Sequence, residues 1–109
     1  MISHTEFLLV CNGANLDKIN EHIQSNKGSF ICKISDETTS TAMLAVQGPE
    51  VMNSLNSISN DISNLKRYRF IVKNLMITSI MISRTGYTGE DGVEIILPKS
   101  FAKKAIDLM

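Results

Sequence analysis

The sequence is poor in cysteine and has no excess of charge of either sign. Its two cysteines, Cys11 and Cys32, are too few for a disulfide framework and lack the spacing of a zinc site. We therefore expect two free thiols, half-buried on strands, in a reducing compartment. Eleven basic residues balance eleven acidic ones. This balance argues against a nucleic-acid partner, which requires a basic face.

Long apolar runs are also missing. No stretch approaches the roughly 20 apolar residues of a membrane span. Residues 1–13 have neither the basic leader nor the cleavage site of a signal peptide. His4 and His22 have no catalytic spacing to an Asp, Cys or Ser. We therefore expect no membrane partner and no metal site.

The sequence does contain enough apolar material for one domain. Of its 109 residues, 43% are hydrophobic and 20% are charged, which is the composition of a globular domain. This length suits one domain and is too short for two ordinary ones. We predict a single domain over residues 1–109.

Hydrophobic spacing predicts nine elements in the order β-α-β-β-α-β-β-β-α. Short apolar or alternating runs indicate strands, and apolar residues three or four apart indicate helices. The predicted strands are 6–12, 29–35, 41–48, two strands within 68–84 that turn at Lys73–Asn74, and 93–98. The predicted helices cover 14–28, a segment from Pro49 that ends within 59–64, and 100–109.

This order predicts an α+β fold, with a mostly antiparallel sheet and helices on one face. The first six elements have the order of a ferredoxin-like βαββαβ core. An extra β-hairpin and a C-terminal helix follow that core. The last helix has no glycine, proline or closing basic turn before Met109, which indicates a piece of a longer protein.

The stretch SRTGYTGEDGVEI differs from the rest of the chain because it is polar and rich in glycine. Gly86, Gly89 and Gly92 follow one another at intervals of three residues. Glycine permits a positive φ and lets a ligand or another backbone come close. Tyr87 adds a flat face and a hydroxyl. We predict a loop of unusual path that holds a ligand.

Strand alternation directs attention to Glu94, which lies on the face opposite Val93. A carboxylate can accept two parallel donors. Glu94 could therefore read the adjacent N–H and NH₂ groups of a pterin or guanine, with Tyr87 beside the ring. The residues alone leave open a long hairpin loop with a solvated Glu94. Glu90 and Asp91 are predicted to be solvated loop charges.

The loop matches no common ion or phosphate motif. TGEDG lacks the alternating oxygen ligands and distal glutamate of a calcium loop. It also lacks the Gly-Lys-Ser/Thr of a phosphate loop. Arg84 offers a planar fork of donors. Thr85 and Thr88 are expected to satisfy backbone groups of the loop.

These segments resemble a known family. SRTGYTGEDGVEI is similar to the signature of the T-protein of the glycine cleavage system, the aminomethyltransferase. LAVQGPE (44–50) and FLLVCNGAN (7–15) resemble two further segments of that family, in the same order and spacing. The resemblance implies the middle, folate-binding portion of a three-domain protein. Such proteins transfer the one-carbon unit from the aminomethyl-lipoyl arm of the H-protein to tetrahydrofolate and release ammonia. A cytoplasmic location is implied, or a mitochondrial one in a eukaryote.

Four folate-site residues follow from the resemblance by motif position. Glu94 would pair with the pterin, and Tyr87 would contact the folate. Asn12, at the end of the first predicted strand, would form part of the pocket wall. Arg84 also matches the motif, with a loop-ordering role preferred over ligand contact. The family's essential aspartate belongs to a Gly-Gly-x-x-Asp-Asp type segment that is absent here, as are its downstream arginine-bearing segments. No catalytic residue is therefore predicted, and the chain alone is expected to be inactive.

Two alternatives remain open. The folate-binding domain of a sarcosine- or dimethylglycine-oxidising enzyme would share this architecture, but the complete Arg-Thr-Gly-Tyr-Thr-Gly-Glu run favours the T-protein. A non-catalytic folate-binding scaffold tends to carry a cysteine in the equivalent loop. Gly86 and Tyr87 stand in that loop here, with no cysteine near them.

Overall fold

The computed structural model of the protein describes residues 1–56 and 59–107. The chain divides into two compact units, Met1–Ser35 and Asp36–Met109. Each unit has its own secondary structure and is described by itself. One domain over residues 1–109 stays a prediction.

The first unit is built on helix α1 (Leu16–Asn26), which follows the short 3₁₀ turn η1 (Gly13–Asn15). Asn15 stands at the N-cap position, where its residue type favours a cap, but its side chain makes no hydrogen bond to the helix. Gly28 has a φ of 54° just beyond the helix end, in the left-handed region that glycine commonly adopts there. The apolar stripe is half-buried, as its spacing predicted, at Leu16, Ile19 and Ile23.

The predicted strands over 6–12 and 29–35 are wrong, because both segments lack regular secondary structure. Their apolar side chains are largely exposed, with Phe7 at 71% and Phe30 at 75%. Alternation shows that a segment could bury one face, but a strand also requires a neighbour for its backbone groups. The ferredoxin-like order is therefore not formed. Cys11 is half-buried and Cys32 exposed, and neither lies on a strand.

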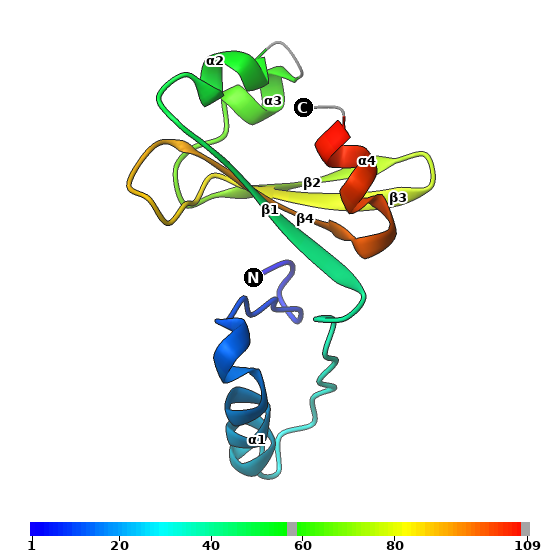
Figure 1. The fold of residues 1–109 in the computed structure, drawn as a ribbon. Coiled ribbons are helices and arrows are strands. Elements are labelled where there is room, and N and C mark those ends of the chain that lie inside the picture. The colour runs from blue at the N-terminus through cyan, green and yellow to red at the C-terminus, as the bar shows by residue number, and fades with distance from the viewer. Residues whose placement is uncertain (57–58, 108–109) are drawn as a thin grey trace. The chain divides into compact units, whose positions relative to one another are not determined.

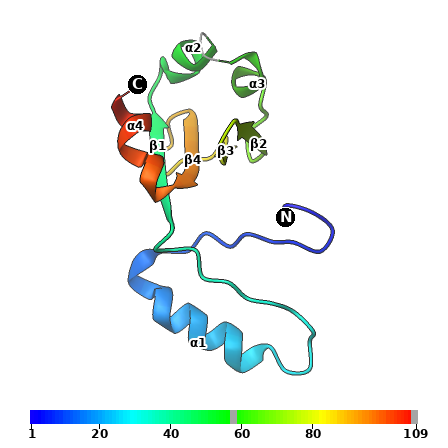
Figure 2. The ribbon, with the colours of Figure 1, turned by 90° about the vertical axis from the view of Figure 1, so that its right-hand side faces the viewer.

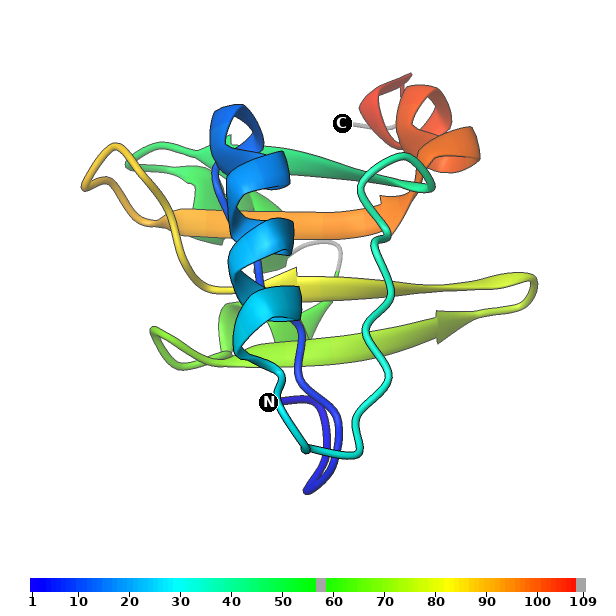
Figure 3. The same ribbon diagram turned by 90° about the horizontal axis from the view of Figure 1, so that it is seen from below.

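The second unit contains a four-stranded antiparallel sheet in the order β1-β4-β3-β2 (Figure 3). Each strand is antiparallel to its neighbour. The α+β class with antiparallel pairing is therefore confirmed. The strands are β1 (Thr41–Gln47), β2 (Phe70–Leu75), β3 (Thr78–Ser83) and β4 (Gly92–Pro98).

The β2–β3 hairpin turns later than the sequence indicated. Lys73 and Asn74 lie inside β2, and the strands close at the pair Leu75–Thr78. Lys73 is satisfied within the strand, because its ammonium group donates to Asp61 of the neighbouring helix. This ion pair stabilises a charged residue inside the sheet. The polarity of Lys73 and Asn74 therefore predicted the turn at the wrong position.

The helices of this unit cover one face of the sheet, as predicted (Figures 1 and 2). Leu55, Ile62, Ile82 and Val93 form the buried core between these helices and the strands. Among the residues that the structure describes, every helix is too short or too polar to span a bilayer. The spacing Val51, Leu55, Ile58 and the spacing Phe101, Ala105, Leu108 each predict an apolar helical stripe, but Ile58 and Leu108 lie outside the described residues. The helical segments are α2 (Val51–Asn56), α3 (Asn60–Ser63), η2 (Lys99–Phe101) and α4 (Ala102–Asp107).

The other face of the sheet carries Glu94. Its partner on β1 is Ala45, and its partner on β3 is Ser83. Paired residues share a face, so this carboxylate stands opposite the helices with a small residue on either side. The apolar residues on the same face include Ile96 and its two register partners, Met43 on β1 and Met81 on β3.

Candidate functional site

The Gly-rich loop joins β3 to β4 and extends past the strand ends (Figure 1). Gly89 has a φ of 85°, a conformation that side chains disfavour. Gly86 and Gly92 are needed for space. A Cβ on Gly86 would meet Gln47 Nε2 at 2.5 Å, and one on Gly92 would meet Val46 O at 2.4 Å. Both predicted uses of glycine, positive φ and close approach, occur in this loop at different positions.

Gln47, at the end of β1, fixes the outer part of the loop. Its Oε1 accepts a hydrogen bond of 2.8 Å from Thr88 Oγ1 and one of 3.4 Å from Thr88 N. Its Nε2 is buried without a partner in the described part of the chain. Thr88 also accepts from Glu90 N at 3.4 Å, so it serves the loop backbone as predicted. Gln47 was not among the predicted site residues, although its position before Gly48-Pro49 marks a strand end.

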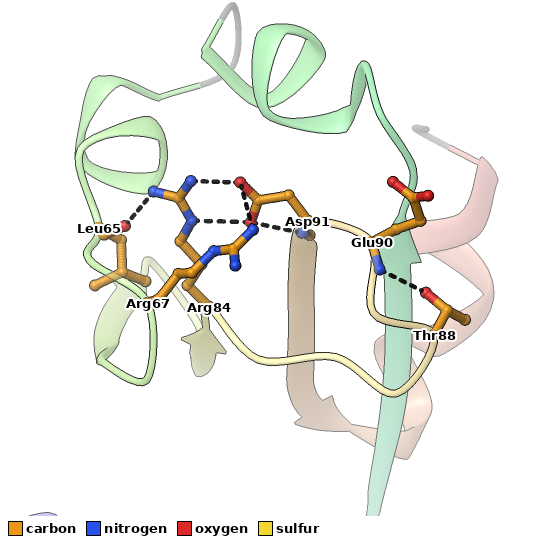
Figure 4. A network of polar contacts seen from close by, with 7 residues as sticks. Leu65, Arg67, Arg84, Thr88, Glu90 and Asp91 are labelled. Carbon is orange, nitrogen blue, oxygen red and sulfur yellow. Dashed lines mark hydrogen bonds and ion pairs between the residues drawn. The ribbon is translucent and has the colours of Figure 1, made fainter.

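Arg84 and Asp91 close the base of the loop (Figure 4). Arg84 Nε donates to Asp91 Oδ1 at 3.1 Å, and Nη2 donates to Asp91 Oδ2 at 2.5 Å. The third nitrogen, Nη1, donates to Leu65 O at 2.7 Å. Figure 4 shows the guanidinium between this carbonyl and the carboxylate. Arg84 thus has the contacts of a loop-ordering residue, and its contact with a ligand stays a prediction.

Asp91 is not the solvated charge that the sequence indicated. Its side chain is 27% exposed, and its Oδ1 also accepts from Gly92 N at 3.0 Å. Arg67 Nη2 lies 3.9 Å from Asp91 Oδ2. The error arose because Arg84 is seven residues away in sequence. Only the closed loop brings the two charges together.

These contacts shift the pKa of both partners. The hydrogen bond from Arg84 lowers the pKa of Asp91. The amide of Gly92 and the charges of Arg84 and Arg67 lower it further, against an opposing effect of burial. The pKa of Arg84 is raised, chiefly by its hydrogen bond to Asp91. Both groups are therefore held in their charged forms.

Glu94 is held by a short chain of hydroxyls. Thr85 Oγ1 donates its proton to Glu94 Oε2. Ser83 Oγ lies 2.9 Å from Thr85 Oγ1 and donates to the backbone oxygen of Glu94 at 3.3 Å. Thr85 was expected to serve the loop backbone, and it binds this carboxylate instead. Oε1 receives no hydrogen bond from the described residues. The half-buried carboxylate is thus oriented and still able to accept donors.

The two remaining predicted site residues are Tyr87 and Asn12. The side chain of Tyr87 is 97% exposed, so its ring packs against neither Glu94 nor the rest of the loop. Asn12 belongs to the first unit, where its Oδ1 accepts from Ala14 N at 3.0 Å and caps η1. Its place in a pocket wall stays a prediction.

A hollow of about 90 Å³ lies at the base of the loop, lined in part by Arg67, Tyr68 and Arg84. That volume corresponds to about three water molecules and is too small for a bicyclic ring. In residues 1–56 and 59–107, no three His, Cys, Asp or Glu side chains are grouped to hold a metal ion.

The fold and the site define an α+β module in which an oriented carboxylate stands on one face of an antiparallel sheet. The chain belongs to the family described as the GCVT N-terminal domain, which matches residues 1–109.

Curated relatives named aminomethyltransferase share substantial identity with the chain. The protein of Rubrobacter xylanophilus is 42% identical over 84% of the chain and 25% of its own length. That of Thermoanaerobacter pseudethanolicus is 40% identical over 92% of the chain and 28% of its length. The Thermotoga maritima protein is 34% identical over 99% of the chain and 30% of its length. The chain therefore spans less than a third of these relatives. No solved structure matches it.

Proposed function

We propose that this chain is the folate-binding part of a glycine cleavage T-protein. The complete protein would transfer the one-carbon unit from the aminomethyl-lipoyl arm of the H-protein to tetrahydrofolate and release ammonia. Residues 1–109 would form one domain, corresponding to the middle portion of the three-domain enzyme. Family membership and the aminomethyltransferase relatives support this reading. The single structural observation that carries it is the oriented carboxylate of Glu94.

Glu94 has the chemistry that a pterin edge requires. Each carboxylate oxygen has two acceptor positions, so Oε2 can retain Thr85 and still accept from a ring group. Oε1 would take the second of two parallel donors. The register partners on the same face, Met43, Met81 and Ile96, offer apolar surface for the ring.

The chain's own residues would bind and orient the substrate rather than perform the chemistry. Orientation of the folate amine toward the aminomethyl carbon lowers the entropic part of the barrier. Tyr87 would close over the folate from the loop, since an exposed ring is available for such a contact. Arg84 and Asn12 are the remaining candidates for folate contact. We place the protein in the cytoplasm, or in mitochondria if its source is eukaryotic.

The test of the binding role is Glu94→Gln in the complete protein, titrated with tetrahydrofolate. The amide keeps the shape but presents an N–H group where an acceptor is needed, so affinity should fall at least tenfold, or about 1.4 kcal/mol. Glu90→Gln is the matched control, because it removes the same charge from the loop and should leave affinity unchanged. Equal affinities for Glu94→Gln and the parent would refute the assignment.

A second measurement tests the expected inactivity of the isolated chain. The 109-residue chain should release no ammonia when supplied with aminomethyl-loaded H-protein and tetrahydrofolate. Turnover by this chain would mean that a catalytic group lies within it. A flavin-binding domain encoded next to this segment would instead favour a sarcosine- or dimethylglycine-oxidising enzyme.

A further inference from the structure

We propose that Asp91 and Arg84 form a clamp that positions the folate-binding loop, with Asp91 as a positioning residue. The proposal rests on the proposed function, because it assigns these two residues to the same site. The clamp consists of the two-point contact between their side chains and the Arg84 contact to Leu65 O.

The two residues stand at the ends of the loop. Arg84 follows the last residue of β3, and Asp91 precedes the first residue of β4. The six residues between them include Gly86 and Gly89, and glycine gives a chain wide conformational freedom. Two parallel hydrogen bonds across the base fix both distance and angle. The clamp therefore narrows the range of conformations of the loop that carries Tyr87.

The clamp also fixes the start of β4 at Gly92, two residues before Glu94. Asp91 Oδ1 accepts from Gly92 N at 3.0 Å, and Asp91 O accepts from Gly48 N at 3.0 Å. One residue thus connects Arg84, the first amide of β4 and the end of β1. On the other side, Arg84 N donates to Arg69 O at 2.9 Å, and Tyr68 N donates to Arg84 O at 3.0 Å.

The arrangement leaves little of Arg84 for another partner. Each of its three nitrogens donates within the protein, and its side chain is 20% exposed. Removal of the clamp should therefore act on folate through the loop. Ordering the loop in advance reduces the entropy lost on binding, so the loss should appear in substrate affinity more than in turnover at saturation.

The experiment compares Asp91→Asn, Arg84→Lys and their double variant in the complete protein, with Glu90→Gln as the control. Titration gives tetrahydrofolate affinity, steady-state kinetics gives KM and kcat, and amide hydrogen exchange reports on residues 85–90 and on β2–β3. We expect each single variant to lose at least fivefold in affinity and to exchange its loop amides at least tenfold faster. The double variant should resemble the single ones, because either change opens the clamp. KM should rise with kcat changed less than twofold, and β2–β3 exchange should be unchanged.

Three results would overturn parts of this account. Unchanged affinity in Asp91→Asn and Arg84→Lys, with normal binding by the parent, would overturn the clamp and leave the proposed function intact. Faster exchange across the whole sheet would make the pair a general stabiliser and also overturn it. No binding of tetrahydrofolate by the parent protein would overturn the proposed function, and the clamp's role in folate binding with it.

Discussion

Gly86 lies directly against the side chain of Gln47. A Cβ at position 86 would stand 2.5 Å from Gln47 Nε2 and 2.9 Å from its Cδ. The same glutamine accepts a hydrogen bond from Thr88 Oγ1. Because Gly86 has no side chain, Gln47 of β1 can lie against it and hold the loop through its hydrogen bond with Thr88.

Gly86→Ala should destabilise the second unit by about 1–2 kcal/mol, as is typical when a methyl group is forced into a packed site. Gln47 is a flexible side chain, so Gln47→Ala should relieve the clash. The double variant should be more stable than the sum of the two single effects predicts. Urea unfolding of the four proteins measures this coupling, and strictly additive effects would contradict the contact.

Gly92→Ala should cost more, roughly 3 kcal/mol or above, because its Cβ would meet the backbone at Val46 O, 2.4 Å away. Gln47→Ala should not rescue it, since the carbonyl remains in place. Gly13→Ala is the control, because a Cβ there meets nothing within 4 Å. The same unfolding measurement applies, and a Gly92→Ala protein as stable as Gly13→Ala would contradict the close approach of β1 and β4.

Asp91→Asn should change the response of stability to acid. The pKa of Asp91 is lowered in the folded protein, so its ionised form stabilises the fold above the ordinary aspartate pKa of about 3.9. That contribution is lost as the pH falls through the lowered value. We expect the parent to be more stable than Asp91→Asn by roughly 1–2 kcal/mol near neutral pH, with the difference shrinking below about pH 4.

Thermal unfolding at several pH values between 7 and 2.5 measures that difference. Glu90→Gln again serves as the control and should show no comparable gap. A gap for Asp91→Asn that stays constant from pH 7 to pH 2.5 would show that the charge of Asp91 is not its source.

Leu55→Ala should test whether α2 covers the sheet. Leu55 is 5% exposed and belongs to the core cluster with Val93, so its truncation should cost about 2–5 kcal/mol. Leu75→Ala removes the same atoms from a side chain that is 50% exposed, and it should cost much less. Equal losses of unfolding free energy in the two variants would contradict the observed packing.

The sequence predicted the elements whose neighbours lie close along the chain. The apolar alternation of β4 predicted that Glu94 and Val93 lie on opposite faces of the sheet. The structure confirms this, because β4 pairs with a strand on both sides. The helical spacing in α1 was equally reliable, since a helix satisfies its own backbone. The segment 29–35 shows the same alternation and forms no strand.

The loop between β3 and β4 shows the same difference between what the sequence predicts and what only the folded chain decides. Its glycines indicated an unusual backbone, but not that Gly86 leaves space for Gln47, which is distant in sequence. Glu94 could be selected by strand period, whereas its fixation by Thr85 depends on how the loop returns to the sheet. Asp91 was misjudged because its pairing depends on loop closure.

By itself the sequence determined the α+β class, the antiparallel hairpins, the exceptional loop and, through its motifs, the family. These features are encoded by period, by glycine spacing and by residue identity, which act over short stretches. The tertiary structure alone decided which apolar segments became strands, where the β2–β3 turn falls, and that Arg84 and Asp91 close the loop. The physical reason is that backbone pairing and charge pairing require a partner, and the distance to that partner is set by the folded chain.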